Sequence, residues 1–348
     1  MKIDSPTFLT ETTFISSSVV FSSGSQKFGN TEDDTHIFIG DISATGSLLI
    51  SGSRISIDDG DDNIAIGKST LASITPGGAQ NVAIGTNAMT NASGVNTDGN
   101  VVIGYNAGDA FGANNVYGTV LIGRQAGSSI NNGDAAGTTA IGYNAGASIT
   151  SGQRNVVMGY QAGLLMTTIS DCVVIGYEAG DALSTGTGRN TIIGGAAGSA
   201  LTTESQNVAI GSSALGSATG ASNVIAIGHR AAVSLSHGDS SGTIAIGALA
   251  LEGANGSHSP NIAIGYRAIN NATTNVAGAV AIGYETLYAN TDNTGNIAIG
   301  YFAMRDGTGG SSRDYNIAIG TEAMRNANGH ISVAIGYTAG KNIRSGGT

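Results

Sequence analysis

A short pattern of alternating large and small apolar residues, closed by a glycine, recurs along most of the chain. Its first copy is Asn-Ile-Ala-Ile-Gly at residues 63–67, and similar copies stand at 81–85, 207–211 and 261–265. Sixteen copies follow one another at spacings of 16 to 20 residues. Their closing glycines are Gly67, Gly85, Gly104, Gly123, Gly142, Gly159, Gly176, Gly194, Gly211, Gly228, Gly247, Gly265, Gly283, Gly300, Gly320 and Gly336. A fixed period of this kind indicates a solenoid or another tandem-repeat architecture.

The alternation within each copy has a period of two, which predicts a short β-strand with two different faces. The residue before the closing glycine is Ile in fifteen copies and Met158 in the other, and the residue before that is Ala in eleven. We interpret the large residues as the face that fills a core, and the small face as closely packed or shallow. The sequence therefore predicts one buried isoleucine column, with one member from each coil. Its members are Ile66, Ile84, Ile103, Ile122, Ile141, Ile175, Ile193, Ile210, Ile227, Ile246, Ile264, Ile282, Ile299, Ile319 and Ile335.

The residues around each strand repeat as well. Asn stands at the head of nine copies, Tyr follows the closing glycine in eight, and Ala stands three residues after it in fourteen. Seven to ten residues rich in Gly, Ser, Thr, Asn and Asp then predict a loop of variable length. If the copies stack, the asparagines form a hydrogen-bonded ladder along the stack.

One copy is too short to fold alone, so the copies must stack in register to pair their backbone groups. The predicted fold is therefore all-β: a parallel β-solenoid of about sixteen coils over residues 63–348, roughly 70 Å long at the usual strand spacing. Residues 1–62 lack the repeat, and we interpret them as a β-rich adaptor or attachment segment. The loops at 91–99, 111–118, 129–137 and 306–315 are expected to face outward and to carry binding specificity, since loops tolerate variation.

Composition and charge narrow the choice of partner. The net charge of −10 argues against a nucleic-acid groove or an anionic membrane surface. No stretch reaches the roughly 18 apolar residues that span a bilayer, and residues 1–6 open no secretory signal. The single cysteine, Cys172, precedes a predicted strand and is expected to be a buried small residue rather than a reactive thiol.

The sequence contains only weak candidates for metal-binding or catalytic residues. Asp58, Asp59, Asp61 and Asp62 surround a glycine turn and could bind Ca²⁺, but a solvated acidic turn is the favoured interpretation. The five histidines lie in different repeats without metal-ligand spacing, and no phosphate-binding or nucleophile motif is present, so neither an enzyme nor a cofactor is expected. The tyrosines after the glycines could stack against sugars, although simple packing over the coil edge is favoured.

The strings Asn-Ile-Ala-Ile-Gly-Tyr-x-Ala and Tyr-Glu-Thr-Leu-Tyr-Ala-Asn-Thr at 284–291 resemble the head repeats of trimeric autotransporter adhesins. They are still more similar to the related repeats of bacteriophage tail fibres. The resemblance covers residues 63–348 and implies a left-handed parallel β-roll in which three identical chains pack around one axis. It further implies a structural and adhesive fibre protein of a virion that binds a host surface, with other virion proteins as partners of the N-terminal segment.

Two alternatives are weighed against that interpretation. A head fragment of a bacterial cell-surface adhesin would require a secretory signal and a membrane anchor, and the sequence predicts neither. An enzyme of the left-handed hexapeptide-repeat class would show an aliphatic residue every six positions. Thr90 and Asn96 stand six and twelve residues after Ile84, so that pattern fails.

Overall fold

A computed structural model describes residues 62–74, 77–131, 135–235, 241–253, 260–271, 276–289, 293–306, 314–327 and 331–342. The chain divides into two units, residues 1–55 and residues 56–348, and every described residue belongs to the second. The predicted attachment segment 1–62 lies outside the described residues except for Asp62, so its role stays a prediction.

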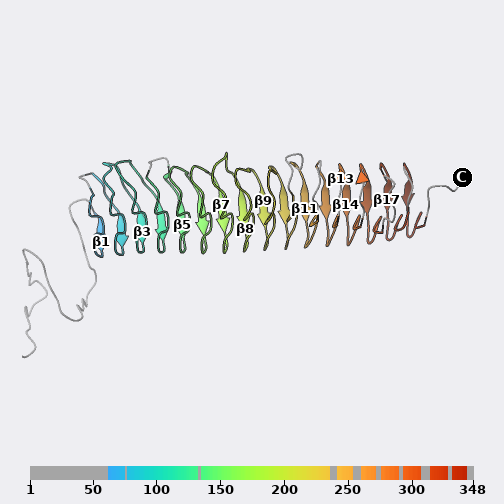
Figure 1. Ribbon diagram of the computed structural model, residues 1–348, viewed down its shortest axis with the longest axis horizontal. Helices are drawn as coiled ribbons and strands as arrows, with labels where there is room; N and C mark the ends of the chain where they lie inside the picture. Colours follow the sequence, from blue (N-terminus) through green and yellow to red (C-terminus); the bar gives the residue numbers. More distant parts are fainter. Residues whose placement is uncertain are drawn as a thin grey trace, which may run out of the picture. The chain divides into compact units, whose positions relative to one another are not determined.

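The described part is all-β and consists of very short strands. They are β1 (Ile64–Ile66), β2 (Val82–Ile84), β3 (Val101–Ile103), β4 (Val120–Ile122), β5 (Thr139–Ile141), β6 (Val156–Met158), β7 (Val173–Ile175), β8 (Thr191–Ile193), β9 (Val208–Ile210), β10 (Ile225–Ile227), β11 (Ile244–Ile246), β12 (Ile262–Ile264), β13 (Val276–Ala277), β14 (Val280–Ile282), β15 (Asn293–Thr294), β16 (Ile297–Ile299), β17 (Ile317–Ile319) and β18 (Val333–Ile335). All but β13 and β15 form one sixteen-stranded sheet in chain order, and those two pair with each other. Figure 1 shows the strands side by side in a single row. The predicted parallel β-solenoid is confirmed.

Every neighbouring pair of strands is parallel and in register. Ile66 pairs with Ile84, and Ile84 pairs in turn with Ile103, so equivalent residues form continuous columns along the stack. The strand hydrogen bonds continue beyond the glycines: the amide of Asn87 donates to the carbonyl of Lys68 at 2.9 Å. Each coil is thus held to the coil before it and the coil after it.

The buried column is the alanine column, two residues before each closing glycine, and not the isoleucine column. Ala83, Ala140 and Ala209 are fully buried, whereas Ile66 is 50% exposed and Ile335 is 67% exposed. The other isoleucines of the column are at least partly exposed on the outer face. The prediction of a buried isoleucine column is therefore wrong for the single chain. The physical reason is that the coil is narrow: a small residue on the inner face leaves room for one large side chain from the opposite wall.

In the coils whose inner residues the structure describes, that large side chain comes from one of two positions. Where the fourth residue after the closing glycine is large, the seventh is small; where the fourth is Gly or Ala, the seventh is large. The first arrangement pairs Met89 with Ala92, Leu215 with Ala218 and Met324 with Ala327. The second pairs Gly108 with Phe111, Gly127 with Ile130, Gly146 with Ile149, Gly163 with Met166, Gly180 with Leu183, Gly198 with Leu201 and Ala232 with Leu235. The first coil is an exception, because Leu71 and Ile74 are both large.

This packing corrects the expectation that the loops simply face outward. Phe111 and Ile130, at the starts of two such loops, are fully buried and fill the coil interior. Val116 is buried as well. Most of the segment 306–315 lies outside the described residues, so its exposure stays a prediction.

The turns depend on residues with positive φ, many of which are residue types that seldom adopt it. The closing glycine and the second and fourth residues after it have positive φ in all sixteen copies, for example Gly85 at 128°, Asn87 at 59° and Met89 at 51°. The residue five positions before the closing glycine also has positive φ in fifteen copies. The exception is Pro260, whose ring fixes φ at a negative value. Many of these residues are not glycine, so the surrounding stack must hold them in a region that L-residues seldom adopt.

The asparagines at the heads of the copies are buried and bridge adjacent coils. The side-chain amide of Asn81 donates to Asn63 Oδ1 at 3.0 Å, as the predicted ladder requires. The backbone amide of Asn81 donates to the same oxygen at 3.0 Å, and its side chain also donates to the carbonyl of Thr97 at 2.6 Å. The ladder of asparagine side chains runs through Asn63, Asn81 and Asn100, and these side chains also satisfy backbone groups of the neighbouring repeats.

Candidate binding surface

The candidate site is the surface that follows the strands, which we call the turn surface. It consists of the first, second and fifth residues after each closing glycine. These positions are mostly at least partly exposed, whereas the third, usually Ala, points into the core. Because the coils are in register, the turn surface presents parallel columns of side chains along the stack.

Two stretches of the first column are stacked tyrosines. Tyr143, Tyr160 and Tyr177 have ring centroids 5.1 and 5.4 Å apart and interplanar angles of 9° and 8°. A second stack contains Tyr266, Tyr284 and Tyr301. Within each stack the ring faces cover one another, so a sugar cannot stack on an inner ring. This arrangement favours packing for most of the column and leaves an open ring face at the Tyr177 end of the first stack, where Gly195 follows.

The guanidinium group of Arg124 continues the first stack. It lies 5.6 Å from the ring centroid of Tyr105 and 5.5 Å from that of Tyr143. A cation over the face of an aromatic ring is attracted by the ring quadrupole. The column from residue 105 to residue 177 is therefore filled by planar groups at every coil.

Charged residues fill the second and fifth columns near the C-terminal end of the stack. Arg305 Nε lies 2.5 Å from Glu285 Oε2, and Arg325 Nε lies 2.8 Å from Asp306 Oδ2. Glu322 contacts both Arg325 and Lys341, and these partners hold the pKa of its carboxyl below its usual value, the Lys341 hydrogen bond contributing most. The pairs Arg305–Glu285, Arg325–Asp306 and Lys341–Glu322 join different columns of adjacent coils and so cross-link successive coils.

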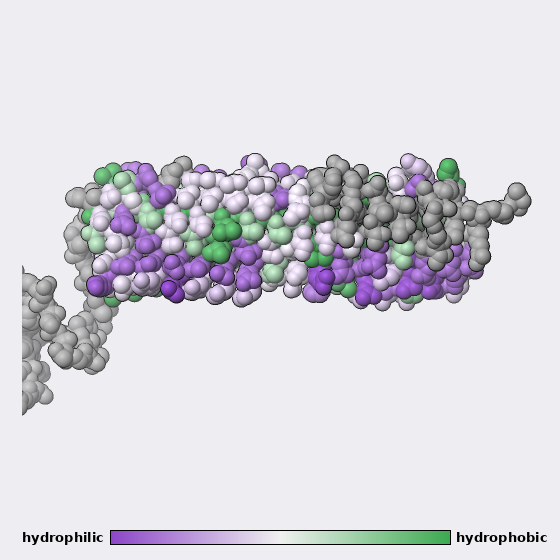
Figure 2. All heavy atoms as spheres, in the orientation of Figure 1, coloured by the Kyte–Doolittle hydropathy of each residue, from purple (hydrophilic) through white to green (hydrophobic). Residues whose placement is uncertain are grey.

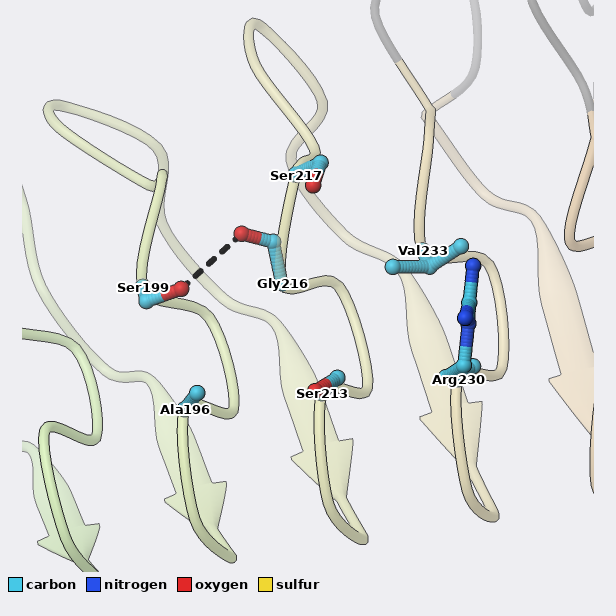
Figure 3. A pocket seen from close by; sticks show the side chains of 7 residues that line it. All are labelled: Ala196, Ser199, Ser213, Gly216, Ser217, Arg230 and Val233. Atoms are coloured by element: carbon cyan, nitrogen blue, oxygen red, sulfur yellow. Dashed lines mark hydrogen bonds between the residues drawn. The ribbon is translucent and has the colours of Figure 1, made fainter.

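A pocket of about 240 Å³ interrupts these columns between the coils of β8, β9 and β10. Figure 3 shows the lining residues: Ala196, Ser199, Ser213, Gly216, Ser217, Arg230 and Val233. The hydroxyl of Ser199 donates to the carbonyl of Gly216 at 2.9 Å. Arg230 closes one end and pairs through its Nε with Glu252 Oε1 at 2.8 Å. The pocket exists because two successive coils carry only small residues where other coils carry Gln, Glu, Arg or Phe.

The coil of β7 borders the other end of the same gap. Tyr177 precedes Gly195 in the first column, and the amide of Ala196 donates to the carbonyl of Tyr177 at 2.8 Å. The hydroxyl of Tyr177 is hydrogen-bonded with Glu178, which raises the pKa of Tyr177. Asp181 precedes Ser199 in the fifth column; burial raises the pKa of its carboxyl, and its Oδ1 is buried without a partner among the described residues.

The outer face of the sheet is a second distinctive surface. It presents the isoleucine column and, two residues earlier in each strand, a column of Val, Ile and Thr, most of them partly exposed. Figure 2 shows the opposite character along the lower edge of the row, where hydrophilic residues form an almost continuous band. Long apolar surfaces of this kind mark association with another molecule.

The predicted metal ligands receive no support from the described residues. Asp58, Asp59 and Asp61 lie outside them, and Asp62 is exposed. Among the residues that the structure describes, no group of His, Cys, Asp and Glu could hold a metal ion. His229 lies exposed in the first column of the turn surface, and the remaining histidines lie outside the described ranges.

Cys172 is buried, as predicted. It occupies a position that asparagine fills in other repeats, and the backbone amide of Asn190 donates to its Sγ at 3.4 Å. Burial raises the pKa of the Cys172 thiol, which lowers its reactivity.

Comparison with known proteins assigns no family: neither the family models nor the curated proteins contain a match to this chain. Across the described ranges, no helix is long and apolar enough to cross a bilayer. The architecture therefore defines the class. The chain is a parallel β-solenoid repeat protein.

The sequence did not predict the pocket. Its signal is nonetheless present in the repeat alignment, because Gly195 and Ser212 interrupt the column that Tyr or Arg fills in the five preceding repeats.

Proposed function

We propose that this protein is a structural and adhesive fibre protein of a bacteriophage virion, forming the shaft or head of a tail fibre or similar appendage that attaches to a host surface. The observation that carries the proposal is the unbroken parallel sheet of sixteen strands. Such a stack is a stiff scaffold that extends in one direction and presents side chains in fixed columns. The similarity of its repeats to those of tail fibres, Asn-Ile-Ala-Ile-Gly-Tyr-x-Ala above all, supports the assignment to a virion.

The proposed assembly is a parallel homotrimer held together by the outer face of the sheet. A row of partly exposed Ile and Val side chains is unfavourable in water, and burying it stabilises association by about 25 cal/mol per Å². A second and a third copy of the same chain present identical rows with the same spacing. Residues 1–62, in this proposal, join the fibre to other virion proteins.

Antibody labelling of intact particles tests the location. Antibodies raised against residues 63–348 are expected to decorate a fibre on phage particles in electron micrographs. Decoration of a bacterial cell surface, with bare particles, would favour the adhesin alternative and overturn the virion assignment. Particles built with a chain that lacks residues 1–50 are expected to carry no fibre.

The assembly is tested by native mass spectrometry. The wild-type protein is expected at three times the chain mass of 34.4 kDa. Ile246→Lys with Ile264→Lys places two charges on the outer face and is expected to give monomers. Ala248→Lys is the matched control, because Lys68 occupies the equivalent position in the first repeat. A folded wild-type monomer, or equal dissociation of the control, would contradict the proposed interface.

A further inference from the structure

The pocket between the coils of β8, β9 and β10 belongs to a longer gap in the turn surface, which we call the central notch. Ala196, Ser199, Ser213 and Gly216 line the pocket, and the small residues Gly195 and Ser212 stand next to Ala196 and Ser213 in the first column. Tyr177 and His229 lie three coils apart at its two ends in the first column, a distance of about 14 Å at the usual strand spacing. A gap of that width admits one or two six-membered rings.

The first wall of the notch is an aromatic face. Tyr160 covers one face of Tyr177, and the other side of Tyr177 adjoins Gly195. A Cβ built on Gly195 meets no atom within 4 Å, so the space beside the ring is open, and Tyr177 is 57% exposed. A flat ring placed at the level of Gly195 would continue the stack that runs through Tyr143 and Tyr160.

The polar groups around the notch include both hydrogen-bond donors and hydrogen-bond acceptors. Ser213 and Ser217 line the pocket and have no side-chain hydrogen bond within the described part of the chain. Glu178, which is hydrogen-bonded with Tyr177, provides acceptor oxygens at the tyrosine end, and Arg230 provides donors at the other end. A compact ligand with several hydroxyl groups can donate to the carboxylate and accept from the guanidinium at the same time.

The charges argue for an uncharged ligand. Arg230 is already neutralised by Glu252, while the carboxylate of Glu178 lies at the opposite end. The whole chain carries a net charge of −10, which repels anions. A ring with one apolar face and several hydroxyls, without a carboxylate or phosphate, fits this balance.

We propose that the central notch binds an uncharged hexose unit of a saccharide, stacked on the open face of Tyr177 and hydrogen-bonded by the serines and Arg230. The inference deepens the proposed host attachment, since it names the ligand class and the place on the shaft. Single-sugar contacts of this type are weak. The array of three equivalent notches in a trimer would raise the effective affinity for a surface that carries many sugars.

Saturation-transfer NMR on the full chain tests the proposal, with methyl glucoside, methyl galactoside and methyl mannoside as probes. At least one probe is expected to receive saturation at its ring protons from the wild-type protein. Gly195→Tyr extends the tyrosine stack into the notch, and its expected effect is complete loss of that transfer. Thr86→Tyr is the matched control, because it adds the same side chain at the same position of a distant repeat and is expected to leave transfer intact.

Three outcomes would overturn the inference: no transfer from the wild-type protein to any of the three probes, equal transfer in both variants, or stronger transfer to methyl glucuronide than to methyl glucoside. Binding of a protein receptor to a surface that Gly195→Tyr does not affect would likewise count against it. Particle labelling separates this inference from the proposed function. If antibodies label a fibre on virions but no probe receives saturation from the central notch, the proposed function is retained and only the sugar-binding inference is rejected.

Discussion

The closing glycines are fixed by two independent constraints at the level of the single residue. Gly211 has φ of 125°, a region that residues with a Cβ rarely adopt. A Cβ at Gly211 would also lie 2.6 Å from the carbonyl oxygen of Gly228 in the next coil. The stack therefore demands glycine here because the turn requires it and because the next backbone passes too close.

The two constraints can be separated by mutation. Gly336 has a similar φ of 131°, but a Cβ there meets only the Cβ of Ala339, at 3.8 Å. Gly211→Ala and Gly336→Ala share a backbone penalty of about 1–3 kcal/mol, and only Gly211→Ala adds a clash with fixed backbone. Thermal unfolding should therefore show a larger loss of stability for Gly211→Ala. Equal losses would mean that the close approach contributes nothing.

Glu204 provides a pH-dependent prediction at the same scale. Burial alone would raise its pKa, but backbone N–H groups, led by that of Gly220 and including those of Thr202 and Thr203, donate to the carboxylate and hold the pKa below its usual value. Such a group stabilises the fold above the unfolded pKa of about 4.3, and the contribution disappears as pH falls through the folded pKa. Glu204→Gln should lower the free energy of unfolding by about 1–3 kcal/mol at neutral pH, with the difference vanishing in acid, as measured by denaturant titration.

Asp181 serves as a control, because its pKa is shifted in the opposite direction to that of Glu204. Burial raises its folded pKa, so its charged form opposes folding above the unfolded pKa and that penalty is absent in acid. Asp181→Asn should leave stability unchanged in acid and increase it at neutral pH. If both variants instead shifted stability in the same direction at neutral pH, the account of these two carboxyls would be wrong.

At the scale of the element, each coil is a small core with one place for a large side chain. The two core arrangements are mutually exclusive in nearly every described coil, because the fourth and seventh positions compete for the same space. A Cβ at Gly127 would lie 2.8 Å from Leu121 Cδ2 and 2.9 Å from Ile130 Cδ1. In the β9 coil, Ala209 and Ala218 leave that space to Leu215.

Exchange of one arrangement for the other tests this competition. Gly127→Leu alone overpacks the coil and should cost at least about 1–3 kcal/mol. The triple variant Leu121→Ala, Gly127→Leu and Ile130→Ala reproduces the residues of the β9 coil and should recover most of that loss. Denaturant unfolding of the three single variants and the triple measures the coupling. A triple variant as unstable as the sum of its parts would show that the coils do not pack as interchangeable units.

The strands were predictable from sequence, but the inside of the coil was not. The alternation of Ile and Ala, followed by glycine, located each strand and its register in the stack. It showed two faces without showing which face is inside, because the answer depends on the opposite wall. That wall is shaped by positive φ at residues such as Met89 and Gln80, whose residue types do not indicate a left-handed conformation. The pocket was not predicted for a related reason. It forms where residues such as Ser199 and Ser213 are smaller than the residues at the same positions of other coils, and a small residue alone does not indicate a cavity.

At the scale of the whole molecule, stability depends on neighbouring coils only. Deletion of residues 248–265 removes one complete repeat and joins equivalent positions, so a folded protein shorter by about 4.8 Å per chain is expected. Deletion of Ala263 alone shifts the outer isoleucine of that strand into the space of the alanine column. Circular dichroism and small-angle scattering should show a folded, shorter stack for the first variant and a destabilised stack for the second. The reverse outcome would contradict nearest-neighbour packing.

The in-register columns have a consequence for how such a molecule changes over generations. Repeats with nearly the same pentapeptide, such as residues 207–211 and 261–265, provide equivalent points at which a gene rearrangement can join one coil to another. Each exchange in matching phase adds or removes whole coils, and the junction restores the same strand, glycine and turn. The length of the stack can therefore change in increments of one strand spacing, and each intermediate length is expected to fold.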